Sequence, residues 1–182
     1  MIETTQTVPV RAEIGSVWSH VRHIGNWAAL MPGLQTFELI DDVNSRWVLK
    51  VGVGALVRTV QVEVHVDLWD GPERALFSFK LQGDPVKGGG AYFARTIGTD
   101  ATEMDLSIQV EGTGPMAPMW EAMGRPLLPK FALAFARQLA ESIEQASGSP
   151  ARPEAAAASI PARLVAWLCG LWRSLRGVRA SQ

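Results

Sequence analysis

The sequence predicts an α+β fold in which a strongly curved antiparallel sheet grips one long helix. Segments between residues 45 and 110 alternate apolar and polar side chains with a period of two, as strands with one buried face do. Helical spacing of apolar residues is present before these segments and returns after them. Because strands bracketed by helices are typical of α+β proteins, a βαβ parallel sheet is not expected.

The predicted strands carry one apolar face each. They are expected at residues 2–10, 46–53, 60–68, 75–81 and 104–110. From residue 60 to residue 68, valine and leucine alternate strictly with polar side chains. Turn-forming residues separate the segments, at 41–44, 70–72, 83–85 and 98–100.

Helices are predicted at both ends of this run of strands. Residues 12–31 have helical spacing in two short pieces, with a break at Gly25-Asn26. After residues 112–115 one apolar stripe continues to Leu139, and Pro126 and Pro129 should kink or break its first part. The polar face of this long helix is expected to carry Arg125, Lys130, Arg137, Glu141 and Glu144.

Charge is divided unevenly along the 182 residues. Residues 147–182 hold five arginines and one glutamate, a net charge of +4. The preceding 146 residues hold 12 basic and 17 acidic side chains, a net charge of −5. An acidic body with a basic tail argues against nucleic-acid binding and points to an anionic partner for the tail alone.

The chain is expected to divide into three parts. Residues 1–146 contain every predicted strand and the long helix, so they should form the folded domain. Residues 147–159 are rich in Ser, Pro and Ala and predict a flexible linker. Residues 160–179 predict an amphipathic helix, and no segment has the length of a membrane span.

This terminal helix has the composition of a helix that lies in a membrane surface. On a helical wheel one apolar sector collects Ile160, Leu164, Trp167, Leu168, Leu171, Leu175 and Val178, and Trp172 widens it. Arg173 and Arg176 lie outside the sector and Arg179 at its edge. Two tryptophans, four arginines and no acid favour binding to anionic lipid. The alternatives are packing on the body or on another copy, or docking into a partner enzyme.

Catalytic and metal sites are not expected. The acids Glu63 and Asp67 fall on the outward phase of their strand. His20 and His23 have no third ligand near them in sequence, and His65 falls on a polar phase. The single cysteine, Cys169, allows no intrachain disulfide and no cysteine-based metal site.

Three consecutive glycines, Gly88-Gly89-Gly90, precede a strand rather than a helix, so they do not predict a phosphate loop. We expect bulges that let the sheet bend, or a place where a ligand approaches the backbone. On the same strand, Phe93 and Arg95 share a face, which places one of them inward or at a rim.

Five short motifs carry a resemblance to a known family. They are Val17-Trp18, Met31-Pro32-Gly33-Leu34, Lys50-Val51-Gly52-Val53-Gly54, Gly88-Gly89-Gly90-Ala91 and Gly112-Thr113-Gly114-Pro115. With these motifs and this order of elements, the chain resembles the carbon monoxide dehydrogenase CoxG family of the START-like, helix-grip (SRPBCC) superfamily. The resemblance covers residues 1 to about 146.

The resemblance implies a cavity between sheet and helix that takes a hydrophobic ligand, such as menaquinone or ubiquinone. Apolar, aromatic and methionine side chains are expected to line it: Trp27, Met31, Trp47, Phe79, Phe93, Leu106, Met116, Met119, Trp120 and Met123. It also implies service to a carbon monoxide dehydrogenase-type molybdenum hydroxylase, by recruiting it to the membrane or exchanging quinone.

Three functional hypotheses follow. The first is a non-catalytic binding protein, peripheral on the cytoplasmic face of the cell membrane, without a covalently bound cofactor. The second is a START-like cyclase or hydrolase. The third is a membrane tether whose cavity is filled by its own side chains. An inward-facing polar pair would favour the enzyme, and the sequence indicates none.

Overall fold

The computed structural model describes residues 1–53, 56–115 and 117–148 of the chain. Its elements run in the order β1 (Ile2–Val10), α1 (Ile14–Val21), α2 (Ile24–Ala28), β2 (Leu34–Leu39), β3 (Asn44–Val53), β4 (Leu56–Asp70), β5 (Arg74–Gln82), β6 (Val86–Gly98), β7 (Ala101–Gly112), α3 (Ala117–Gly124) and α4 (Leu128–Ala146). The predicted α+β fold, with a curved antiparallel sheet around a long helix, is confirmed.

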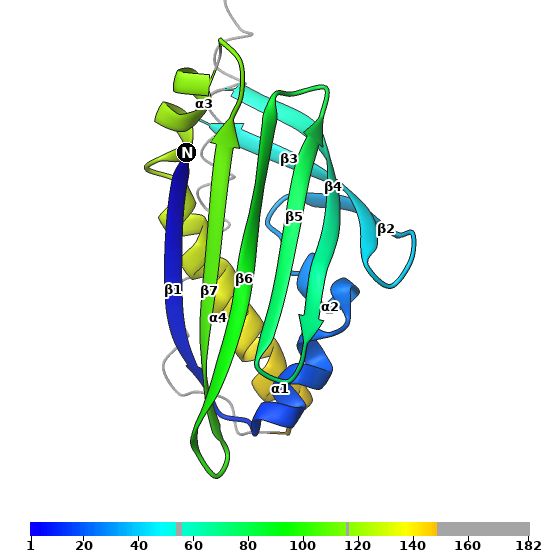
Figure 1. Ribbon diagram of the computed structural model, residues 1–182, viewed down its shortest axis with the longest axis vertical. Helices are drawn as coiled ribbons and strands as arrows, with labels where there is room; N and C mark the ends of the chain where they lie inside the picture. Colours follow the sequence, from blue (N-terminus) through cyan, green and yellow to red (C-terminus); the bar gives the residue numbers. More distant parts are fainter. Residues whose placement is uncertain (54–55, 116, 149–182) are drawn as a thin grey trace, which may run out of the picture. The chain divides into compact units, whose positions relative to one another are not determined.

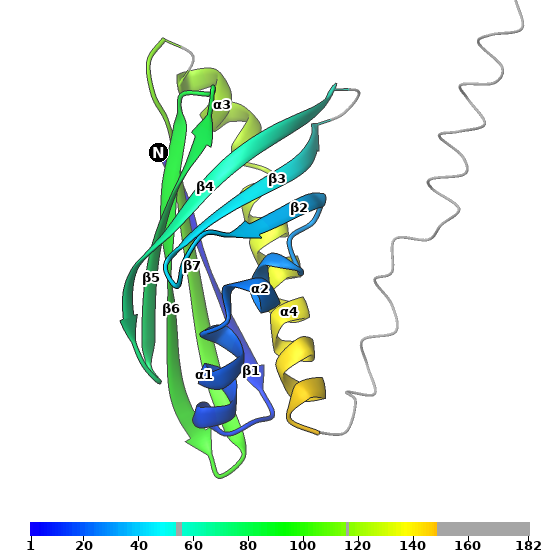
Figure 2. The same cartoon turned by 90° about the vertical axis from the view of Figure 1, so that its right-hand side faces the viewer.

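The seven strands form one antiparallel sheet in the order β1-β7-β6-β5-β4-β3-β2. Strands β2 to β7 follow one another as a meander, and β1 closes the far edge by pairing with β7 (Figure 1). Helices α1 and α2 connect the two edge strands. In the view of Figure 2 these helices and α4 lie on the same side of the sheet.

The core lies between this face of the sheet and the helices. Val60, Val62, Val64 and Val66 of β4 are all buried, which confirms the inward phase read from their alternation. Trp47 of β3 is buried as well, and its indole N–H donates a hydrogen bond of 2.8 Å to Oγ of Ser45. The four valines provide apolar area, and Ser45 supplies a hydrogen-bond acceptor for the indole N–H of Trp47, the one polar group of that buried side chain.

Prolines divide the C-terminal helical region as predicted. Helix α3 ends at Gly124, Pro126 lies in the connection, and α4 begins at Leu128 with Pro129 in its first turn. Proline is tolerated there because the first N–H groups of a helix have no partner within the helix. The break expected at Gly25-Asn26 is wrong, since both residues lie inside α2 and the helices separate at Arg22 and His23.

Glu144 is not on the exposed face of α4, where the sequence placed it. Its side chain is buried, with 5% of the residue exposed. One carboxylate oxygen accepts the backbone N–H of Arg11 at 2.9 Å, and the other accepts its guanidinium at 3.0 Å. Arg11 follows β1, so this pair ties the C-terminal end of α4 to the edge of the sheet. The partner is 133 residues away, and no local pattern indicates it.

The triple glycine of β6 is not a bulge. Strand β6 pairs with β5 and β7 without a register shift from Val86 to Thr96. A Cβ at Gly88 would lie 2.4 Å from the ring of Phe79, and one at Gly90 would lie 2.5 Å from the ring of Phe77. The glycines therefore leave space on the inner face of the sheet, and two aromatic rings of β5 occupy it.

We expect Gly90→Ala to destabilise the protein by about 1–3 kcal/mol, because the new methyl group meets both the Phe77 ring and the carbonyl oxygen of Ser107 at 2.4 Å. Gly15→Ala is the matched control. It lies in α1, the nearest atom to its Cβ is 4.0 Å away, and alanine should stabilise the helix by about 0.5–1 kcal/mol. Chemical denaturation measures both changes. Equal stability of the two variants would contradict this account of the glycines.

A histidine joins the first and last helices. Nε2 of His20 in α1 lies 3.1 Å from the hydroxyl oxygen of Ser142 in α4. Partial burial lowers the pKa of His20, and the neighbouring His23 lowers it further. The folded state therefore takes up a proton at this site less readily than the unfolded chain does.

Because the pKa of His20 is lower in the folded state, stability should fall as the pH drops below about 6.5, the pKa of histidine in an unfolded chain. Melting temperatures between pH 7.5 and 5.5 measure this effect. His20→Gln should reduce the loss of stability. Ser142→Ala should retain it, because burial is the main cause of the shift. An unchanged pH dependence in His20→Gln would rule out the imidazole as its source.

Candidate binding cavity

A cavity with two lobes lies between the inner face of the sheet and helices α2, α3 and α4. The narrow lobe has a volume of about 70 Å³ and the wide lobe about 330 Å³. Both lobes share one stretch of wall, made of Trp27, Met31, Phe77, Ile108 and Phe131. The two lobes therefore adjoin along this wall, and the wide lobe alone is large enough for a small hydrophobic molecule.

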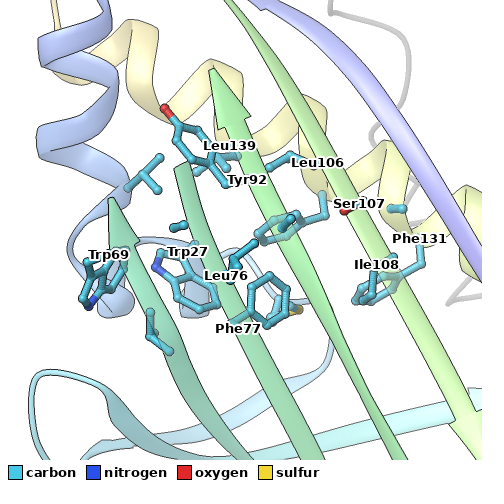
Figure 3. Close-up of a pocket in the computed structure, with 17 residues that line it drawn as sticks. Trp27, Trp69, Leu76, Phe77, Tyr92, Leu106, Ser107, Ile108, Phe131 and Leu139 are labelled. Carbon is cyan, nitrogen blue, oxygen red and sulfur yellow. The ribbon is translucent and has the colours of Figure 1, made fainter. Parts of the chain in front are cut away.

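The narrow lobe is enclosed mainly by aromatic and aliphatic groups from seven helices and strands. Trp69 lies at the end of β4, Tyr92 on β6 and Leu106 on β7, while Phe135 and Leu139 come from α4. Figure 3 shows Trp27 between Trp69 and Phe77, with Tyr92 and Leu139 on the side of the helix. Trp27 also contacts Phe77 with ring centroids 5.7 Å apart.

The wide lobe extends from the shared wall toward the opposite end of the sheet. Its floor is the inner face of β3, β4 and β5, from which Trp47, Leu49, Val62, Phe79 and Leu81 project. Trp120 of α3 and Leu127 and Leu128 near the start of α4 lie on its other side. Nearly all of this lining is hydrocarbon, so a polar molecule would lose more hydration than it regains.

Six of the ten side chains predicted for the cavity lie in its wall: Trp27, Met31, Trp47, Phe79, Leu106 and Trp120. Phe93 does not, and this expectation is wrong. The residue is 44% exposed, because Tyr92 and Ala94 are the inward residues of this part of β6. Met119 is 43% exposed and outside the lining. Met116 and the side chain of Met123 lie outside the described residues.

Several lining residues were not singled out from the sequence. Phe77 and Leu81 belong to the alternating segment that also contains Phe79, so periodicity identified their inward phase but not their role. Phe131 and Phe135 belong to the apolar stripe of α4 in the same way. Tyr92 had no such signal, because two adjacent aromatic residues follow three glycines and the phase between them is ambiguous.

Titratable side chains in the lining are few. Among the described residues that line the two lobes they are Tyr92 and Glu121. Burial raises the pKa of Tyr92, so its hydroxyl stays protonated at neutral pH, and it donates a long hydrogen bond of 3.5 Å to the carbonyl of Pro72. Glu121 pairs with the amino group of Met1. The two groups line different lobes, so they do not form an acid–base pair.

Three of the four tryptophans that line the two lobes differ in the partners of their indole N–H groups. Trp47 donates to Ser45, and Trp69 donates to the carbonyl of Asp42 at 3.4 Å. The Nε1 atom of Trp27 is buried and has no hydrogen-bond partner among the described residues. Only 8% of Trp27 is exposed. An unsatisfied buried donor is uncommon in folded proteins and indicates either a missing partner or a specific role.

The outer face of the sheet carries solvated ion pairs. Arg95, considered for a place at the cavity rim, lies beside the exposed Phe93 and pairs with Glu103 and Asp105 of β7. In the part of the chain that the structure describes, no group of three or more His, Cys, Asp or Glu side chains is arranged to hold a metal ion. No described helix is long and apolar enough to span a bilayer.

Comparison with known structures places the fold. A conserved protein from Geobacillus kaustophilus is 16% identical over 80% of this chain and 97% of its own, with a TM-score of 0.69. A START superfamily protein from Mycobacterium smegmatis is 17% identical over 80% and 97%, with a TM-score of 0.58. The Zhui aromatase/cyclase from Streptomyces sp. R1128 is 17% identical over 82% and 99%, with a TM-score of 0.57.

These likenesses establish a START-like helix-grip fold. No curated protein matches the sequence closely enough to suggest an activity. The sequence profile of one family, described as polyketide cyclase/dehydrase and lipid transport, matches residues 1–144. That match spans the whole sheet and nearly all of α4. The chain therefore belongs to the polyketide cyclase/dehydrase and lipid-transport family.

Proposed function

We propose that this protein binds an apolar small molecule, an isoprenoid quinone or a lipid, in the two-lobed cavity and carries it without chemical change. The observation that carries the proposal is the cavity itself, about 330 Å³ in its wide lobe and lined almost entirely by hydrocarbon. Burial of an apolar ligand in such a space is favoured by roughly 25 cal/mol for each Å² removed from water. The lipid transport in the family description supports the same function.

The polar groups of the cavity favour binding over catalysis. Cyclisation or hydrolysis needs groups that give and take protons near the reacting atoms. Tyr92 in the narrow lobe is held protonated, and Glu121 in the wide lobe is paired with the Met1 amino group. The second candidate function is that of a cyclase, which the name of the aromatase/cyclase neighbour and the family description support.

The proposed ligand connects the protein to a membrane. Residues 160–179 lie outside the described residues, and their apolar sector with four arginines supports binding to the anionic inner face of the cell membrane. The resemblance to the CoxG family supports a partner of the carbon monoxide dehydrogenase type. In this proposal the body exchanges quinone between that molybdenum hydroxylase and the membrane, or recruits the enzyme to it.

Full-length protein titrated with decylubiquinone should show saturable quenching of tryptophan fluorescence. Val62→Phe should weaken the affinity about tenfold or more, because a phenyl ring placed on the floor of the wide lobe occupies ligand volume. Gln61→Phe is the matched control, since it adds the same ring to the exposed outer face of β4. Equal loss of affinity in both variants, or no saturable binding of quinone or acyl lipid, would contradict the proposal. Recovery of a chemically altered ligand would favour the cyclase.

Full-length protein should cosediment with vesicles containing anionic lipid, more strongly at low salt. Leu168→Glu and Leu171→Glu should abolish cosedimentation, because each puts a charge in the middle of the apolar sector. Ala166→Glu, on the opposite side of the helical wheel, changes the net charge equally and should retain most of the binding. If all three variants bind alike, charge alone or another part of the chain makes the contact.

A further inference from the structure

We infer that the indole N–H of Trp27 is the polar anchor of the cavity, and that the ligand is an apolar molecule with an uncharged oxygen acceptor, such as a quinone or ketone carbonyl. This inference deepens the proposed function and rests on it. The indole N–H would select among hydrophobic ligands, favouring those with an oxygen acceptor over pure hydrocarbons.

The position of Trp27 carries the first step. It belongs to α2, which crosses the inner face of the sheet, and it lines both lobes. Its ring is held by Trp47 at 5.4 Å and Phe77 at 5.7 Å between centroids. In Figure 3 the nitrogen is on the edge of the ring toward Trp69, on the side of the narrow lobe. A rigidly packed ring at the junction of the lobes fixes where its donor is.

The missing partner carries the second step. Trp27 is 8% exposed, and its Nε1 has no acceptor among the described residues, whereas the indoles of Trp47 and Trp69 each have one. A water molecule is a poor substitute, because an ordered buried water needs two to four polar partners. The narrow lobe offers few, since the other polar residues of its lining are Ser107 and Tyr92, and Tyr92 already donates to Pro72.

The unequal sizes of the lobes carry the third step. The narrow lobe, about 70 Å³, suits a small group such as a carbonyl, while the wide lobe, about 330 Å³, suits a ring or chain. Met31 lines both lobes, and its flexible thioether side chain can move aside as the ligand oxygen approaches the nitrogen. Because the lining presents no cationic side chain among the described residues, the geometry favours a neutral acceptor over a carboxylate.

The test compares two probes that differ by two carbonyl oxygens, 2,3-dimethyl-1,4-naphthoquinone and 2,3-dimethylnaphthalene. Calorimetric titration of full-length protein should show tighter binding of the quinone. Trp27→Phe should lower the affinity for the quinone about five- to tenfold, which is the effect of losing one neutral hydrogen bond. The same variant should change the affinity for the hydrocarbon less than about twofold. Trp18→Phe is the matched control, because Trp18 lines neither lobe and the ratio of the two affinities should not change.

A second measurement follows ligand binding in the wild-type protein and uses the variant only to assign a signal. The chain has seven tryptophans, so ¹⁵N-labelled protein gives up to seven indole N–H signals. The Trp27 signal, assigned by its absence in Trp27→Phe, should move downfield with the quinone and not with the hydrocarbon. Saturable binding of both probes with an unchanged ratio in Trp27→Phe, or a Trp27 signal that both probes move alike, would overturn the anchor and leave the proposed function standing. Binding of neither probe would overturn both.

Discussion

The close approach of α4 to the edge of the sheet is the constraint on which the rest of the structure depends. Alanines at 132, 136 and 140 form the buried row of this helix, and their small side chains let its backbone lie near β1. Glu144, the next residue of the row, binds the backbone and guanidinium of Arg11 and so fixes the helix along its axis. Burying a carboxylate is costly without such partners, and their loss would leave an unpaired charge in the core.

The cavity follows from how the inner face of the sheet is covered. In its C-terminal half the buried residues of α4 include Ala136, Ala140 and Ile143, whereas Leu128, Phe131 and Phe135 line open space. On the sheet side, Gly88 and Gly90 carry no side chain, and the rings of Phe77 and Phe79 extend over them. An aromatic floor and a helix with bulky side chains thus enclose a volume that neither fills. Aromatic and methionine walls suit ligands of irregular apolar shape.

Periodicity predicted the strands and the long helix because burial on one face repeats every two or every 3.6 residues. Periodicity could not predict features that do not repeat along the sequence. Three glycines gave β6 no phase, so Phe93 was placed inward and Tyr92 overlooked. Glu144 continues the alanine row at four-residue spacing, but its partner Arg11 lies at the other end of the chain. For the cavity, the pattern identified inward side chains such as Phe79 and could not show which of them touch empty space.

Under the proposed function, the polar groups that line the narrow lobe keep a fixed protonation state. The tyrosine hydroxyl in the narrow lobe stays protonated because burial raises its pKa, and an indole N–H does not ionise at any ordinary pH. The Tyr92 hydroxyl and the Trp27 N–H therefore keep the same protonation state across the physiological range. A neutral ligand held by the Trp27 N–H and by apolar area carries no charge that salt could screen. In the proposed function, added salt would therefore screen the contact with an anionic surface and would screen no charge between the ligand and the cavity.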